Sequence, residues 1–154
     1  MQFRRIGQLV AATTVSAVAL SGAQAVAQEN KTTISVTNIT DIHGHLEDKI
    51  GDPAKAGDEI GVARLQSLIK QVNEGQEFNL TSSGDNVGGS AFVSAISDDK
   101  YTLEALNQMG MKVSAVGNHE FDKGTEDLTE RIQPNSTYPI LGANVLKDGK
   151  PLLK

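Results

Sequence analysis

Three short polar segments of this chain carry the residue types that metal-assisted chemistry needs. They are residues 41–45 (Asp-Ile-His-Gly-His), 84–86 (Gly-Asp-Asn) and 117–122 (Gly-Asn-His-Glu-Phe-Asp), and together they contain all three histidines of the 154-residue sequence. Each segment follows an apolar run. Imidazole and carboxylate groups are ligands of divalent transition metals. If several strand ends bring such groups together, they form a hydrolytic metal site.

Strand and helix patterns alternate along the rest of the sequence. Alternating or β-branched runs predict strands at residues 33–39, 78–81, 112–116 and 138–142. Apolar residues at helical spacing predict helices at 62–72, 101–109 and 125–132, and residues 48–61 are expected to form a surface loop. Asp98 or Asp99 is the expected N-cap of the second helix, and Gly110 its C-terminal stop.

This order of elements predicts an α/β fold with a mainly parallel sheet covered by helices. In open sheets of this kind, ligands bind at the carboxyl ends of the strands. The three polar segments all fall at such ends. We therefore expect Asp41, Asp85 and Asn118 to meet at one rim, although they are far apart in the sequence.

The first 27 residues have the pattern of a secretory signal peptide. Arg4 and Arg5 form a basic start, residues 6–20 are mostly apolar or small, and small residues near 23–27 suit signal peptidase. A membrane anchor is the alternative, but the apolar stretch is shorter than the roughly 20 residues that a spanning helix needs. We expect an exported protein that is secreted, periplasmic or associated with the cell envelope, with no transmembrane segment in its mature part.

Composition limits the partners of the mature protein. The sequence has a formal net charge of −5, and removing residues 1–27 makes it more negative because two arginines and no acidic residues are lost. A negative chain is a poor binder of nucleic-acid polymers. The absence of cysteine excludes thiolate metal clusters and disulfides. Any metal must therefore bind oxygen and nitrogen ligands.

Taken together, the motifs resemble those of a known superfamily. Asp-x-His at 41–43, Gly-Asp-Asn at 84–86 and Gly-Asn-His-Glu at 117–120 look like the calcineurin-like metallophosphoesterases. Residues 41–46, 61–65 and 117–122 resemble, within that superfamily, the secreted 5′-nucleotidases. The resemblance covers roughly residues 33–144 and implies the N-terminal half of a layered α/β/β/α sandwich, with the sheet incomplete in this chain.

The resemblance also implies a role for each matching residue. Two divalent ions, zinc, manganese, cobalt or iron, are expected at four ligands: Asp41, His43, Asp85 and Asn118. Among these, Asp85 matches the carboxylate that bridges the two ions. His119 matches the catalytic histidine, and Asp122 the carboxylate that orients it. Taken singly, Asp85 and Asn118 could also be ordinary turn residues, because each follows a glycine.

The implied activity is metal-dependent hydrolysis of nucleotide phosphate esters. A nucleoside 5′-monophosphate, cleaved to nucleoside and phosphate, is the expected substrate. A 2′,3′-cyclic nucleotide phosphodiesterase and a nucleotide-sugar hydrolase are the enzymatic alternatives. A non-catalytic secreted metal-binding or adhesive module is the alternative from another class. The oligomeric state is left open.

The sequence departs from the family pattern after Asp122, where no further histidine occurs. Members of the family supply three more metal-binding histidines from the second half of the same domain. We therefore expect residues 28–154 to be the N-terminal part of the metal-binding domain, without its C-terminal half and without the nucleotide-specificity domain. On its own, such a fragment is expected to have little hydrolytic activity.

Overall fold

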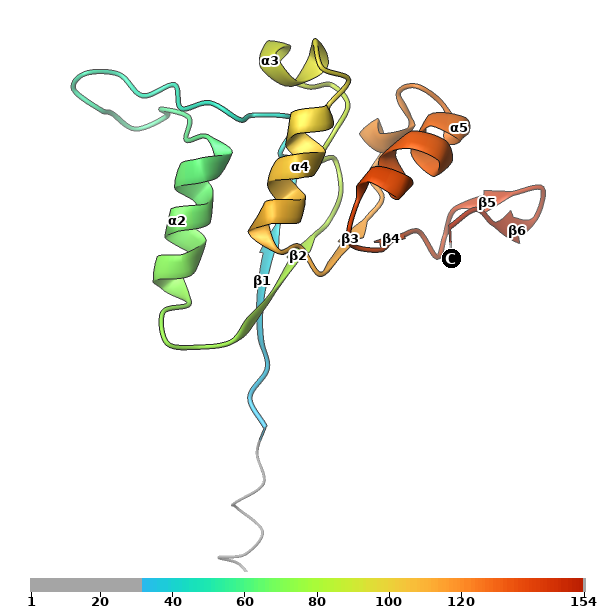
Figure 1. Ribbon diagram of the computed structural model, residues 1–154, viewed down its shortest axis with the longest axis horizontal. Coiled ribbons are helices and arrows are strands. Elements are labelled where there is room, and N and C mark those ends of the chain that lie inside the picture. The colour runs from blue at the N-terminus through green and yellow to red at the C-terminus, as the bar shows by residue number, and fades with distance from the viewer. Residues whose placement is uncertain (1–31, 154) are drawn as a thin grey trace, which may run out of the picture. The chain divides into compact units, whose positions relative to one another are not determined.

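The computed structural model describes residues 32–153, so the expected signal peptide at 1–27 lies outside the described residues (Figure 1). Its centre is a four-stranded parallel sheet in the order β1-β2-β3-β4. The strands are β1 (Ser35–Ile39), β2 (Phe78–Ser82), β3 (Val113–Ala115) and β4 (Ile140–Leu141). The predicted α/β fold with a parallel sheet is confirmed.

Helices connect successive strands, as crossover connections in a parallel sheet require. The helix α2 (Val62–Val72) links β1 to β2, and α4 (Lys100–Met109) lies between β2 and β3. The predicted helix at 125–132 consists of α5 (Thr125–Asp127) and a π-helical turn, η2 (Leu128–Ile132), and a 3₁₀ turn, η3 (Gln133–Asn135), follows. Pro134 lies in η3, where its missing N–H prevents a regular helix from continuing.

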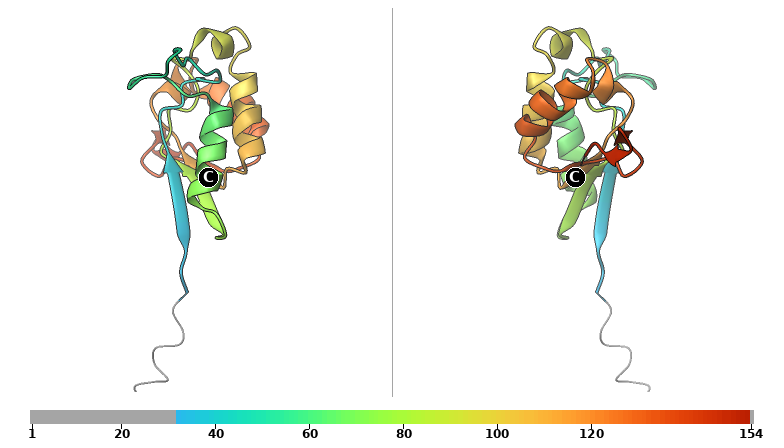
Figure 2. Two further views of the ribbon diagram at one scale, coloured as in Figure 1. Left: turned by 90° about the vertical axis from the view of Figure 1, so that its left-hand side faces the viewer. Right: turned by 90° about the vertical axis from the view of Figure 1, so that its right-hand side faces the viewer.

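The core lies between the helices and one face of the sheet. Leu80 of β2, Leu106 of α4 and Leu128 of η2 are almost fully buried there. Figure 2 shows α2 and α4 on the same side of β1. The opposite face carries Val36 and Leu141, whose exposed fractions are 61% and 45%. Burial therefore alternates along β1, as expected when only one face of a strand is covered.

Besides η3, the sequence patterns did not predict three smaller elements. These are α3 (Phe92–Ala95), the 3₁₀ turn η1 (His119–Phe121) and a hairpin of β5 (Leu146–Lys147) with β6 (Lys150–Pro151). Within the described part of the chain, no helix is both long enough and apolar enough to cross a membrane.

The predicted N-cap position of α4 is confirmed at Asp99. Its side chain, however, makes no capping hydrogen bond. Its carboxylate is buried and instead accepts hydrogen bonds from Ser94 Oγ at 2.7 Å and from Gly88 N at 3.3 Å. Asp98, the alternative cap, pairs with Lys123 at 2.6 Å. The contact with Gly88 ties the segment before α4 to the loop that follows β2, and the Asp98 pair ties it to the segment after η1.

Candidate metal centre

The loops that leave β1 and β2 run side by side, and this pairing brings two of the polar segments together. Asp41 N donates to Gly84 O at 3.1 Å, and His43 N donates to Asp85 O at 3.2 Å. These hydrogen bonds continue beyond the last residues of the paired strands. The third segment follows β3, the next strand in the sheet, so all three reach the same rim.

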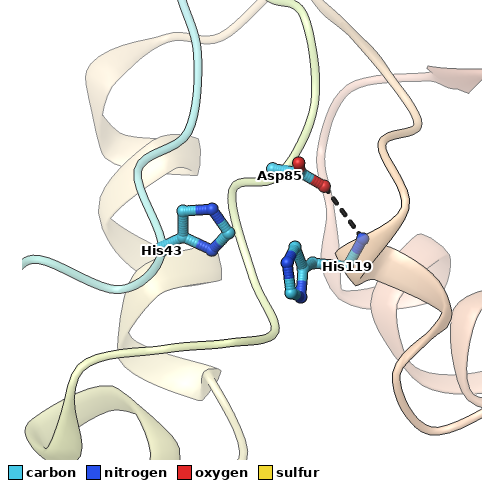
Figure 3. Close-up of side chains that lie close together, drawn as sticks. All are labelled: His43, Asp85 and His119. Carbon is cyan, nitrogen blue, oxygen red and sulfur yellow. Dashed lines mark hydrogen bonds between the residues drawn. The ribbon is translucent and has the colours of Figure 1, made fainter.

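His43, Asp85 and His119 converge at this rim. Each offers one ligand atom, and the three atoms all lie within 4.8 Å of one another. Figure 3 shows the three side chains coming from separate loops, with His119 N donating to Asp85 Oδ1 at 2.9 Å. The imidazole rings meet edge to face with their centroids 4.8 Å apart. All three residues are half-buried.

The hydrogen bonds of the two imidazoles leave one ring nitrogen of each free for a ligand. His43 Nδ1 lies 2.8 Å from Gly88 O, and because a carbonyl only accepts, Nδ1 carries the proton. His119 Nδ1 lies 3.0 Å from Asp122 Oδ2. Metal-binding histidines are held in this way by a carbonyl or a carboxylate behind the ring. The donor set of two imidazoles and one carboxylate therefore fits a divalent transition metal.

The Asp122 contact also changes the protonation of His119. The hydrogen bond to the Asp122 carboxylate raises the pKa of His119 above its ordinary value, and the nearby negative charges of Asp85 and Glu120 act in the same direction. The same hydrogen bond lowers the pKa of Asp122, and Gly89 N, which donates to Asp122 Oδ2 at 2.8 Å, adds to this effect. The pair therefore favours a protonated imidazole beside an ionised carboxylate.

A glycine turn packs directly against both histidines. Gly88 and Gly89 have positive φ angles of 78° and 53°. A Cβ on Gly88 would lie 2.2 Å from His119 O, and one on Gly89 would lie 3.1 Å from the His119 ring and 3.4 Å from His43 Nδ1. A side chain at Gly88 would clash with the backbone of His119, and one at Gly89 would press on its ring, so the glycines leave the space that His119 occupies.

The other two predicted ligands lie beside this cluster. Asp41 Oδ1 is 3.7 Å from His43 Nε2, and the second Asp41 oxygen accepts a hydrogen bond from Thr40 Oγ1. Asn118 directly precedes His119 and is exposed, and its backbone carbonyl accepts from Phe121 N. Ligation by Asn118 and Asp41 stays a prediction. Asp122 Oδ2 lies 3.0 Å from His119 Nδ1, and its orienting role also stays a prediction.

Three of the six non-glycine residues with positive φ in the described part of the chain are candidate ligands. Asp41, His43 and Asp85 have positive φ angles of 55°, 43° and 53°, which non-glycine residues rarely adopt. Such conformations persist only where the surroundings hold them, and they cluster at functional sites.

His45, the remaining histidine, lies outside the cluster. Its Nδ1 is 3.1 Å from Glu59 Oε2, and Glu59 also pairs with Lys49 at 2.7 Å. His45 is not among the four predicted ligands. The sequence reasoning missed the Gly88 carbonyl and the buried Asp99, because neither a carbonyl acceptor nor a buried turn carboxylate has a sequence signal.

Comparison with known proteins identifies relatives over most of the chain. No family model matches it. It is 30% identical over 122 residues to the 5′-nucleotidase of Rattus norvegicus, matching 75% of this chain and 21% of that protein. It is 30% identical over 148 residues to a cell wall protein of Listeria monocytogenes, matching 88% of this chain and 19% of that protein.

The solved structures include the NAD nucleotidase of Haemophilus influenzae. The TM-score is 0.60 with 24% identity, over 75% of this chain and 21% of that chain. This likeness concerns the fold. The chain spans about a fifth of the length of each of these three proteins. It is therefore homologous to the N-terminal region of the 5′-nucleotidases and has a metallophosphoesterase-like fold.

Proposed function

We propose that the protein hydrolyses phosphate esters of nucleotides with the help of two divalent metal ions. The observation that carries this proposal is the convergence of His43, Asp85 and His119 from three strand ends. The homology to 5′-nucleotidases supports a nucleoside 5′-monophosphate as the substrate, with nucleoside and phosphate as products. The proposal concerns the whole natural protein, because the chain corresponds to about a fifth of these relatives.

The ions would be held by Asp41, His43, Asp85 and Asn118. Bound divalent ions supply positive charge for the oxygens of the transferring phosphoryl group. They also allow an anionic substrate to approach a negatively charged protein, because their field dominates locally. Zinc, manganese, cobalt and iron all suit oxygen and imidazole ligands.

His119 would act as the general acid. Asp122 holds the proton on Nδ1, which leaves Nε2 as the nitrogen that can donate a proton to the departing nucleoside oxygen. The raised pKa of His119 favours the protonated form that this step requires. If His119 instead binds an ion directly, its replacement removes metal as well as activity.

Activity measurements on the native protein recovered from its source test this proposal. We expect release of phosphate from nucleoside 5′-monophosphates, lost on chelation and restored by manganese, zinc or cobalt. His119→Ala should lower turnover by about 100-fold or more while the metal content stays close to native. His45→Ala is the matched control, because His45 pairs with Glu59 outside the cluster, and it should keep native turnover.

Other outcomes would redirect the proposal. Preferential turnover of 2′,3′-cyclic nucleotides or nucleotide sugars would keep the metal chemistry and change the substrate. Native turnover in the His119→Ala protein would exclude the general-acid role. A metal-loaded native protein without any hydrolysis of these substrates would favour a non-catalytic metal-binding or adhesive module.

The proposal includes the organisation and export of the protein. Residues 28–154 would form the N-terminal part of the metal-binding domain, with further ligands supplied by other residues of the natural protein. Residues 1–27 would direct export, in keeping with the cell wall relative in Listeria. N-terminal sequencing of the native protein tests the signal peptide, because cleavage near residue 27 is expected and an N-terminus at Met1 would contradict it.

A further inference from the structure

Glu120 is a buried carboxylate that has no part in the proposed chemistry. It lies in η1 next to His119 and is only 2% exposed. Burial of a carboxylate is costly unless hydrogen bonds or an opposite charge compensate for it. Within residues 32–153, Glu120 forms no ion pair. Backbone N–H groups stabilise it instead.

Four such N–H groups point at the Glu120 carboxylate. Its Oε1 accepts from Asn86 N at 2.8 Å and from Val87 N at 3.5 Å. Its Oε2 accepts from Gly117 N at 2.6 Å and from Asp85 N at 3.0 Å. Asp85, Asn86 and Val87 are successive residues, and their N–H groups form a concave nest that can bind an anion. Glu120 thus joins the loop after β2 to the loop after β3.

These contacts fall on the residue whose position matters most for the metal site. Asp85 has a left-handed φ of 53°, a conformation that its surroundings must maintain. Glu120 accepts a hydrogen bond from the backbone N–H of Asp85, and the N–H of His119 donates to Asp85 Oδ1 at 2.9 Å. Residues of η1 therefore form hydrogen bonds with both the backbone and the side chain of Asp85.

We infer that Glu120 is a positioning residue that fixes Asp85 relative to His119 and thereby sets the metal affinity of the centre. This inference rests on the proposed metal site. The competing explanation is that Glu120 stabilises the fold and does nothing specific for metal binding. If Glu120 positions Asp85, a Glu120 variant loses metal affinity while an equally destabilised core variant does not. If Glu120 only stabilises the fold, its variant binds metal like the native protein or loses no more affinity than the core variant.

Cobalt titration of the native-length protein separates them, because Co²⁺ reports both affinity and coordination geometry in its visible spectrum. Glu120→Gln keeps the shape of the side chain but leaves one acceptor oxygen and turns an NH₂ group toward backbone donors. We expect a loss of about 10-fold or more in Co²⁺ affinity and shifted visible bands.

The matched control destabilises the core away from the three ligands. Leu106 is fully buried in α4, so Leu106→Ala should lower the melting temperature while Co²⁺ affinity and bands stay native. Circular dichroism at the titration temperature establishes that each variant is folded. If Glu120→Gln does not fold, Glu120→Asp decides, because it keeps the charge but is too short to reach both loops.

Each result has a distinct meaning. Weaker Co²⁺ binding and altered bands in the folded Glu120 variant, with native values in Leu106→Ala, support the inference. Native affinity and bands in the folded Glu120 variant overturn it, as does an equal loss in Leu106→Ala. Absence of Co²⁺ binding by the unmutated protein contradicts the proposed metal centre itself, and thus also removes the basis of this inference.

Discussion

Replacing Gly117 by alanine perturbs the metal site through a single added carbon. A Cβ at this position would lie 2.2 Å from Asp85 Oδ1 and 2.6 Å from Asp85 N. Its φ lies outside the left-handed region, so alanine adds no strain to its own backbone. The effect of Gly117→Ala therefore comes from the clash with Asp85 alone.

The size of the effect follows from these distances. Carbon atoms do not approach oxygen or nitrogen so closely, so Asp85 must retreat by roughly 1 Å, a displacement that can lower catalysis about 100-fold. Such a movement also disrupts the hydrogen bonds of Asp85 with Glu120 and His119. Overpacking of this kind destabilises proteins by about 1–3 kcal/mol. We expect metal affinity to fall by about 10- to 100-fold.

The assay is metal titration by calorimetry together with thermal unfolding. Gly51→Ala is the matched control, because its Cβ would make ordinary contact at 3.4 Å with Pro53 O in the remote loop, and its φ is also outside the left-handed region. It should bind metal like the native protein. A folded Gly117→Ala protein with native metal affinity would refute the reasoning that Asp85 must stay where it is.

Three further predictions follow from the same contacts. Asp122→Asn should lower the pKa of His119, as followed by NMR titration of the metal-free protein. An unchanged pKa would exclude the Asp122 contact as the cause of the raised pKa of His119. Because folding raises the pKa of His119, its pair with Asp122 stabilises the native state below the ordinary histidine pKa, and this contribution disappears as pH rises through the raised pKa. At acid pH the contribution is lost because Asp122 becomes protonated. Melting temperatures of the native and Asp122→Asn proteins over a pH series should show this window. Leu106→Ala should cost about 2–5 kcal/mol of unfolding free energy in chemical denaturation, because Leu106 is fully buried, and a loss below about 1 kcal/mol would contradict its place in the core.

The regular elements of this chain could be predicted because their side chains obey a simple periodicity. Strands β1, β2, β3 and β4 and helices α2 and α4 lie where the apolar patterns placed them. The convergence of His43 and Asp85 also follows from sequence, since the carboxyl ends of neighbouring parallel strands share one rim. The contacts of Glu120 with backbone N–H groups, in contrast, become visible only in the structure.

Details that depend on the backbone could not be predicted in this way. The Gly88 carbonyl behind His43 has no sequence signal, because every residue carries a carbonyl. Asp99 occupies the N-cap position of α4 as expected, but the hydrogen bonds of its carboxylate with Ser94 and Gly88 have no sequence signal. The hairpin of β5 and β6 is different, because it turns at Asp148 and Gly149, an Asp-Gly pair that is a sequence signal for a hairpin.

Anomalous diffraction from crystals of the manganese-loaded native protein tests the central claim most directly. The three strand ends should hold a metal ion, so we expect an anomalous peak within bonding distance of His43 Nε2 and the Asp85 carboxylate, with His119 beside it. Manganese bound only elsewhere on the protein, with this rim empty at saturating metal, would contradict the account.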